Sequence, residues 1–412
     1  MNHGLAISAT PPQPFFTTPE QRLALARERY FEDGIRPSGL VGESVIQSWS
    51  RCLQAHRRPG EAVSFEPVTE SRSRSALARS RALLASAEAE LRQLETTLAG
   101  TACTVLLTDP HGIVVHAARP RACHGEVLMP LAARVGVNLA EAAIGTNAPG
   151  LTARTGLPSV VLGAEHFFGC VQVMRCAAAP IRDIHGQVAG VLDVSSESRP
   201  FGFDAAAVVA LFATAIENRL LRAQSAEHIV VHLQTSPALL NTPMEGLVGV
   251  APDGRIAWAN GAAARLLGIA APAAGLDVEA AFALGVTQLA ARTRRHEPGP
   301  HRLPSGLNVW LLARMQTADG AGPVVGIGGP MPTSNATRAA SSGTNGAPAL
   351  RADSGALPDD GDDADPATPG SLRGSSRHLI VRTLDECAGN VSHAARKLGV
   401  SRGLIYRHLK KV

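Results

Sequence analysis

Lysine is almost absent from this chain of 412 residues. Its three lysines, Lys397, Lys410 and Lys411, all lie in the last sixteen positions, and the other strongly basic residues are arginines. Chemistry that depends on a lysine side chain, such as a Schiff base or a phosphate-binding loop, is therefore excluded from the first 396 residues. The motif G-x-x-x-x-G-K-[ST] does not occur, so we expect the chain neither to bind nor to hydrolyse ATP.

Long apolar runs and paired cysteines are also missing. No stretch of ~18 apolar residues is present, and residues 1–10 lack the basic and apolar segments of a signal peptide. The cysteines form no C-x-x-C pair and have no histidine at zinc-ligand spacing, so we expect neither metal nor cofactor. We expect a reduced protein of the cytoplasm, without membrane contact. The six cysteines are Cys52, Cys103, Cys123, Cys170, Cys176 and Cys387.

The chain is long enough for two to four domains, and its pattern predicts an α+β multidomain protein. Residues 1–20 are punctuated by prolines and are expected to be a disordered tail. Residues 21–96 show helical spacing of apolar residues. Within them Leu77, Leu84, Leu91 and Leu98 are each a heptad apart, a stripe that packs either on a neighbouring helix or on a second subunit.

From residue 102 the apolar period changes to that of strands. Residues 105–107 and 113–115 flank a turn at 109–112, and residues 177–182 and 188–194 flank a similar turn at 183–186. Both patterns predict hairpins, and residues 159–162 predict a further strand. A long helix is predicted from Asp204, as its N-cap, through Ala223.

A smaller version of the pattern recurs at residues 243–317. Apolar residues at 246–250 and 256–260 flank a turn at 252–254, a helix is predicted at 261–267, and another strand at 307–315. Residues 327–374 then consist mostly of Gly, Ser, Ala, Pro, Thr and Asp. Such a composition offers too few apolar side chains to offset the entropy of ordering, so we predict a disordered linker there.

The last segment, 375–412, predicts a helix-turn-helix. Helices are expected at 377–387, 392–398 and 401–411, where Ala395 permits a close helix crossing and Gly399 the sharp turn. Residues 373–412 carry nine Arg and Lys against two acidic residues, a net charge of +7. A charge that dense in so short a segment is typical of a phosphate-binding face.

Several stretches resemble one family of bacterial regulators. The C-terminal "CAGNVSHAARKLGVSRGLIYRHLKKV" is similar to the Fis-type helix-turn-helix of enhancer-binding proteins. Upstream, "VIQSWSRCLQAH", "EAAIGTNAPGLTA", "GAEHF" and "CAAAPIRDIHGQVAGVLDVS" resemble the sensory part of the acetoin-catabolism-regulator (AcoR-like) family, whose core is a GAF domain. "GLVGVAPDGRIAWANGAAARLLG" is similar to a PAS domain. The AAA+ ATPase that usually separates sensor from helix-turn-helix in this family has no counterpart here, since only the 327–374 linker lies between them.

This resemblance implies a domain order and a set of DNA contacts. It implies a GAF-like sensor at 97–222, a PAS-like domain at 237–326 and a Fis-type DNA-binding domain at 375–412. It also implies that double-stranded DNA is contacted by one face of the last helix. The implied contacts are Ser401, Arg402, Gly403, Tyr406, Arg407, Lys410 and Lys411.

The sensor offers one cluster of chemistry-bearing residues. His166, Cys170 and Cys176 are close in sequence, and His166 and Cys176 are the residues we expect in an effector pocket. A buried thiol and a structural histidine explain the same residues without a ligand, and we favour that explanation over a metal site. Asn147 and Asn260 are expected to form turns rather than ligand contacts.

The leading hypothesis is a homodimeric, sequence-specific DNA-binding transcriptional regulator that senses a small effector or a partner and is not an enzyme. The alternative is a non-enzymatic adaptor or antagonist that associates with a full-length AAA+ relative. No nucleophile–base pair, phosphate loop or zinc signature supports an enzyme.

Overall fold

The structure is a computed structural model that describes residues 18–118, 126–269 and 275–316, together with Lys397. The chain divides into one unit of residues 1–333 and a second of residues 334–412. The first unit is described below. The expected tail up to residue 17, the linker at 327–374 and the helix-turn-helix at 375–412, Lys397 apart, lie outside the described residues.

Among the described residues, four α-helices precede the first sheet, in the stretch where the spacing of apolar residues predicts helices. Helix α1 begins at Pro19, inside the stretch expected to be disordered, because the Thr18 side chain accepts a hydrogen bond from the backbone of Gln21 and Pro19 fits the first helical position. The last part of the stretch with helical spacing forms two helices that are separated at Ser80. The bounds are α1 Pro19–Arg27, continued by a π-helical turn at Glu28–Glu32, α2 Glu43–Gln54, α3 Glu70–Arg79 and α4 Arg81–Thr97.

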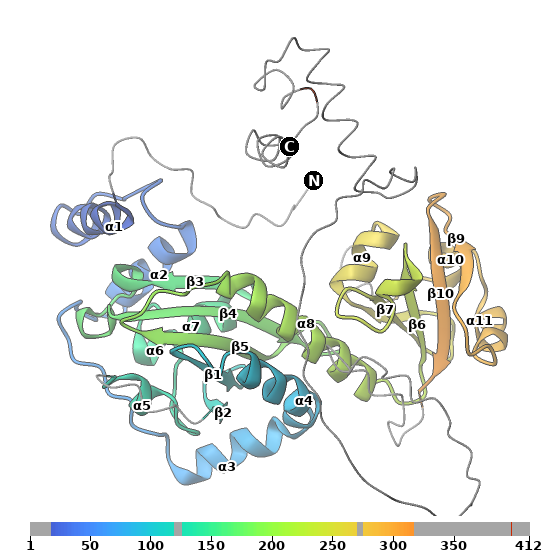
Figure 1. The fold of residues 1–412 in the computed structure, drawn as a ribbon, viewed down its shortest axis with the longest axis horizontal. Helices are drawn as coiled ribbons and strands as arrows, with labels where there is room; N and C mark the ends of the chain where they lie inside the picture. Colours follow the sequence, from blue (N-terminus) through green and yellow to red (C-terminus); the bar gives the residue numbers. More distant parts are fainter. Residues whose placement is uncertain (1–17, 119–125, 270–274, 317–396, 398–412) are drawn as a thin grey trace, which may run out of the picture. The chain divides into compact units, whose positions relative to one another are not determined.

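The first sheet has five antiparallel strands in the order β2-β1-β5-β4-β3 (Figure 1). Both predicted hairpins are confirmed, as is the strand at 159–162. Each hairpin turn follows the same plan, in which an aspartate, Asp109 or Asp183, accepts backbone hydrogen bonds across the turn. The strands are β1 Cys103–Thr108, β2 Val114–Ala117, β3 Ser159–Leu162, β4 Met174–Arg182 and β5 Val188–Glu197.

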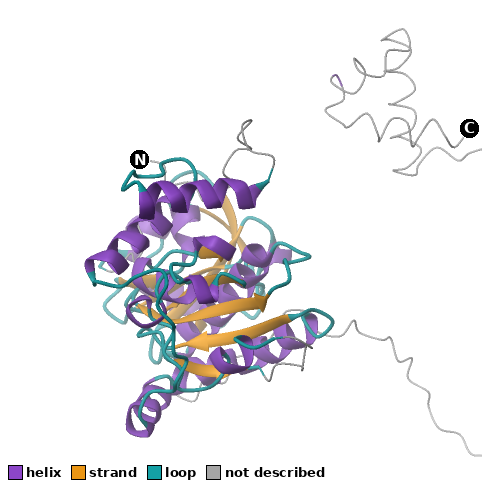
Figure 2. Cartoon of the chain, turned by 90° about the vertical axis from the view of Figure 1, so that its left-hand side faces the viewer, coloured by secondary structure: helices purple, strands orange, loops and turns teal. Residues whose placement is uncertain are grey.

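Alternating side chains of this sheet enter two separate cores, and helices flank the strands on both sides (Figure 2). One face, which carries Leu106, Cys176 and Val191, packs under α1, α2 and the short helices. The other face, with Leu107 and Leu192 among its residues, packs under α4 and α8 (Ala205–Ala223), whose N-cap is Asp204 as predicted. The short helices are α5 Met129–Ala132, α6 Glu141–Ile144 and α7 Ala148–Thr155.

The heptad leucines belong to the second of these cores. Leu91 and Leu98 are buried in it, and Leu77 and Leu84 pack against its edge half-buried. Packing within the domain therefore accounts for the stripe, and no second subunit is needed to cover it.

A second antiparallel sheet follows, in the order β8-β7-β6-β10-β9. The predicted strands at 246–250, 256–260 and 307–315 and the helix at 261–267 are confirmed. The centre of the sheet is β6 (Ile229–Gln234), which the sequence analysis missed and which precedes the expected domain start at 237. The remaining elements are β7 Gly246–Val250, β8 Ile256–Ala259, β9 Gly299–Arg302, β10 Asn308–Met315, α9 Gly261–Leu267, α10 Val278–Phe282 and α11 Val286–Arg292.

Helix α8 is shared by the two sheets. Phe212 and Ile216 pack in the core beneath the first sheet, whereas Leu221 packs with Val230 and Trp258 of the second. The chain then turns once and enters β6 directly. The C-terminal end of α8, which packs on the first sheet, thus also packs against the second sheet.

Candidate functional site

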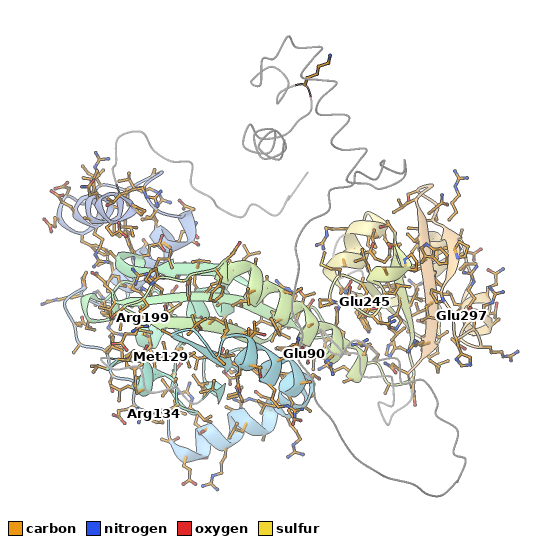
Figure 3. All side chains as sticks on the ribbon, in the orientation of Figure 1. Glu90, Met129, Arg134, Arg199, Glu245 and Glu297 are labelled. Atoms are coloured by element: carbon orange, nitrogen blue, oxygen red, sulfur yellow. The ribbon has the colours of Figure 1, made fainter. Side chains whose placement is uncertain are left out.

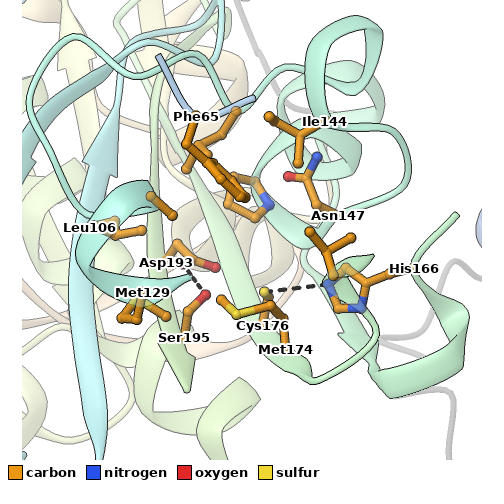
Figure 4. Close-up of a pocket in the computed structure, with 14 residues that line it drawn as sticks. Phe65, Leu106, Met129, Ile144, Asn147, His166, Met174, Cys176, Asp193 and Ser195 are labelled. Carbon is orange, nitrogen blue, oxygen red and sulfur yellow. Dashed lines mark hydrogen bonds between the residues drawn. The ribbon is translucent and has the colours of Figure 1, made fainter. Parts of the chain in front are cut away.

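A cavity of about 30 Å³ lies on the α2-side face of the first sheet (Figure 4). Neighbouring strands supply its polar wall, because Cys176 of β4 stands opposite Ser195 of β5 and Asp193 lies two residues earlier on the same face. The rest of the wall is largely apolar and includes the flexible side chains Met129 and Met174. Both residues expected in an effector pocket, His166 and Cys176, line this cavity.

His166 and Cys176 contact each other, with Sγ 3.6 Å from Nε2. The Nδ1 atom of His166 lies 2.9 Å from the carbonyl oxygen of Gly163, which can only accept, so Nδ1 carries the proton and Nε2 accepts from the thiol. Burial lowers the pKa of His166 to about 4 and raises the pKa of the Cys176 thiol. The pair is a neutral hydrogen bond, in contrast to the thiolate that a cysteine nucleophile requires.

The loop that carries His166 is held in place from the N-terminal helices. Arg27 of α1 donates to the carbonyl oxygens of Ala164, His166 and Phe167 at 2.8–3.1 Å. Its guanidinium also lies 4.7 Å from the centre of the Phe31 ring, and burial lowers its pKa to about 10. These contacts hold the loop at residues 163–167 in a fixed position. They also connect α1 to one wall of the cavity.

Asp193 and its partner Ser195 are polar residues of the wall that the sequence analysis missed. The Asp193 side chain is fully buried, and its Oδ2 accepts a 2.6 Å hydrogen bond from Ser195. Its Oδ1 has no hydrogen-bond partner among the residues that the structure describes. Burial raises the pKa of this carboxyl to about 7, although the bond from Ser195 opposes the shift.

The other residues singled out in the sensor have structural roles. Asn147 caps α7 by accepting from Gly150, and Asn260 caps α9 by accepting from Ala263, as expected of turn-forming side chains. Cys170 is exposed and does not line the cavity, so it does not join His166 and Cys176. In the described ranges, no group of three or more His, Cys, Asp and Glu side chains could hold a metal ion.

A second polar cluster lies along α8, between Glu90 and Glu245 (Figure 3). Arg219 of α8 contacts the buried carboxylate of Glu90 on α4. Three residues on, Arg222 contacts Glu245, whose other oxygen lies 2.8 Å from Nδ1 of His232 on β6. Paired charges of this kind are costly to break once they are buried, so they fix α8 against both of its neighbours.

The residues expected to contact DNA lie outside the described part of the chain, from Ser401 to Lys411. Within the described ranges, no helix is both long and apolar enough to cross a membrane. The expected DNA contacts therefore rest on the sequence and on comparison with known proteins.

Two helix-flanked antiparallel sheets, one with a cavity on a buried face, define a mixed α/β protein. Comparison with known families identifies the parts more closely. Residues 18–215 match the family described as "MimR, N-terminal domain", and residues 371–411 match "Bacterial regulatory protein, Fis family". Two segments of the chain are thus similar to a MimR-type N-terminal domain and to a Fis-family domain, in agreement with the AcoR-like, Fis-type resemblance seen in the sequence.

The curated relatives are named as regulators. Over 178 residues the chain is 28% identical to the "Propane 2-monooxygenase operon transcriptional activator MimR" of Mycolicibacterium smegmatis, which covers 42% of this chain and 29% of the relative. Over 233 residues it is 30% identical to the "Acetoin catabolism regulatory protein" of Cupriavidus necator, covering 54% and 34%. The chain therefore spans about a third of the length of these relatives.

Among solved structures, the E. coli DhaR(N)–DhaL complex matches 66% of this chain and 99% of the matched chain, with 17% identity and a TM-score of 0.41. Pseudomonas aeruginosa HmgR matches 49% and 96%, with 18% identity and a TM-score of 0.26.

Proposed function

We propose that the chain is a sequence-specific, DNA-binding transcriptional regulator without ATPase activity, in which the described unit senses a small effector. One observation carries this proposal: a MimR-type N-terminal domain and a Fis-family segment occur at the two ends of one chain. The names of the relatives, which are transcriptional activators or catabolic regulators, support the same function.

The proposed DNA-binding face lies on the last predicted helix. Ser401 would cap it, and Arg402 and Tyr406, four residues apart, would share the exposed side that faces the major groove. Gly403 permits close approach of the backbone to DNA. Arg407, Lys410 and Lys411 would contact phosphates along the same helix.

The proposed sensor is a GAF-like domain at 97–222 followed by a PAS-like domain at 237–326. Support comes from the five-stranded antiparallel sheet in each half and from the cavity beside His166 and Cys176. A homodimer would present two helix-turn-helix units to a two-fold site, which is the usual way for such units to gain affinity. The heptad leucines do not supply its interface, since they are used within the domain.

Direct selection of DNA by the purified chain tests the proposal. The full chain is mixed with fragments of its own genome, and retained fragments are sequenced, with the double variant Arg402→Ala/Arg407→Ala as the matched control. A regulator enriches a small set of fragments, and the variant loses them. An adaptor that needs a longer relative for DNA contact enriches none on its own, and that result would overturn the proposal.

A further inference from the structure

A second hollow lies beside the first sheet, between α2, α6, α7 and the turn that joins β1 to β2. It is an open cleft of about 520 Å³, within the range of roughly 300–1,000 Å³ that is usual for small-molecule sites. It shares no lining residue with the cavity beside His166 and Cys176. An occupant of the cleft would therefore be recognised by a different set of side chains.

The cleft stays open because much of its wall consists of small residues. Gly150 of α7 is one of them, and a Cβ atom at this position would lie only 2.7 Å from the backbone nitrogen of Glu141. The backbones of α6 and α7 thus approach each other as closely as glycine allows. The other small residues of the wall are Ala55, Ala140, Ala142 and Ala153.

The long side chains that line the cleft are mostly cationic. They include Arg51, Arg57 and Arg154, against the single carboxylate of Glu141 among the described lining residues. Three guanidinium groups and one carboxylate leave a net charge of +2. Arg51 already neutralises Glu141 through bonds of 2.6 and 2.7 Å from Nε and Nη2, so this carboxylate does not compete for the other two arginines.

The other two arginines are held differently. Arg57 Nε contacts Glu61 at 2.7 Å, and its Nη1 donates to the carbonyl oxygen of Ala142 at 3.2 Å. Its guanidinium also lies 4.6 Å from the centre of the Phe168 ring, so it is positioned in advance. Arg154 is exposed in the last turn of α7, and in the described ranges no hydrogen bond or ion pair engages its side chain. Its donors are available to an occupant of the cleft.

We propose that this cleft binds a small organic anion with two acidic groups, of the dicarboxylate or diphosphate class, and that Arg154 and Arg57 contact its oxygens. Two negative charges offset the net charge of the wall, and the planar fork of arginine matches the oxygens of carboxylate and phosphate alike. The inference goes beyond the proposed function, because the cleft and the cavity have no lining residue in common.

Three probes test the charge requirement and distinguish the two acidic groups: succinate, its neutral analogue succinamide, and inorganic pyrophosphate. Each is titrated into the full-length protein by calorimetry at constant ionic strength. Arg154→Gln is the test variant, since the side chain has no bond to lose. Arg199→Gln is the matched control, because Arg199 is another exposed arginine of the same unit that does not line the cleft (Figure 3).

We expect succinate or pyrophosphate to bind at least about tenfold more tightly than succinamide, the value of one hydrogen bond between charged groups. Arg154→Gln should lose this preference at the cleft, and Arg199→Gln should keep it, both with unchanged circular dichroism. The anion that binds more tightly identifies the acidic group.

Anion binding to the basic segment 373–412 is common to all three proteins, so only the difference between the variants reports on the cleft. Affinity for neither anion, equal affinity for succinate, pyrophosphate and succinamide, or equal losses in Arg154→Gln and Arg199→Gln would each overturn the assignment. DNA selection does not depend on these probes, so its failure would count against the proposed function and not against the anion site.

Discussion

Asp193 stands in the middle of an apolar strand, in the run Val191-Leu192-Asp193-Val194-Ser195. Strand alternation places Leu192 and Val194 in one core, so Asp193 and Ser195 must enter the opposite one. The sequence therefore contained a signal for this residue, namely a carboxylate on a strand with both faces buried. Periodicity alone could not show that one of its oxygens would have no partner, because that depends on residues far away in the chain.

The raised pKa of Asp193 predicts a pH-dependent effect of Asp193→Asn on stability. The folded carboxyl has a pKa of about 7 and an ordinary one near 3.8, so the folded state favours the protonated form and loses stability as pH rises between these values. Asparagine does not titrate. At pH 8 the free energy of unfolding of the variant should therefore be higher than that of the wild type by about 1–3 kcal/mol. At pH 5 this difference in the free energy of unfolding should be smaller.

Urea unfolding at the two pH values measures this difference. Glu165 and Glu217, whose pKa values burial also raises to about 7, titrate in both proteins and cancel in the comparison. Asp183→Asn, in the half-buried turn between β4 and β5, is the control and should change little at either pH. An equal gain for Asp193→Asn at pH 5 and pH 8 would show that its carboxyl is not titrating as described.

The helix α8 and the strand β6 determine how the two sheets are connected. In the first sheet the central strand β5 is the last in sequence, whereas in the second sheet the central strand β6 is the first. Since β6 follows α8 after one turn, the helix that closes the first domain leads straight into the middle of the second. A change in the packing of α8 would therefore reach both sheets.

The join between α8 and the second sheet depends on one asparagine. Asn260 donates to Asn218 of α8 and to the carbonyl of Glu245, and it accepts from the backbone of Leu247 and Ala263. Asn260→Ala removes a helix cap and leaves buried groups unpaired, so we expect the free energy of unfolding to fall by about 2–4 kcal/mol.

The matched control is Asp277→Ala, which removes the exposed cap of α10 and should cost about 1 kcal/mol. Both variants are compared by urea unfolding. If Asn260→Ala cost no more than Asp277→Ala, the contacts with α8 would contribute nothing beyond the cap.

Most hairpins, helices and turns were predictable because their signals are local. The two aspartate turns, the caps at Asp204 and Asn260 and the alternation of β4 and β5 each lie within about ten residues of sequence. The strand β6 was missed because one of its two partners, β10, lies far away in sequence, whereas β9 was missed although its partner β10 follows it directly. The role of Arg27 was hidden for the same reason as β6, since its acceptors lie about 140 residues away in sequence.

At the scale of the whole molecule, charge is divided unevenly. Residues 373–412 carry a net charge of +7, whereas the whole chain carries +4. The net charge of residues 1–372 is therefore −3. The excess negative charge lies in residues 317–372, which carry seven aspartates and two arginines, and the basic C-terminal segment concentrates affinity for phosphate at one end of the chain.

Within the basic segment, base-reading and phosphate contacts predict different responses. Arg402 has a planar guanidinium that can contact O6 and N7 of guanine together, so Arg402→Ala should cost about 1–3 kcal/mol on the specific site and relax specificity at one base step. Lys411 is placed for phosphate, so Lys411→Ala should weaken all sequences alike and lower the salt slope by about 1.

The central claim, that this chain reads DNA sequence through its last helix, is tested most directly by one titration. Full-length wild type, Arg402→Ala and Lys411→Ala are each titrated against a selected genomic fragment and a scrambled duplex of equal length, at two salt concentrations. The account predicts that Arg402→Ala loses affinity for the selected fragment but little for the scrambled one, while Lys411→Ala weakens both equally. Equal affinity of the wild type for the two duplexes, or equal losses on both for Arg402→Ala, would contradict it.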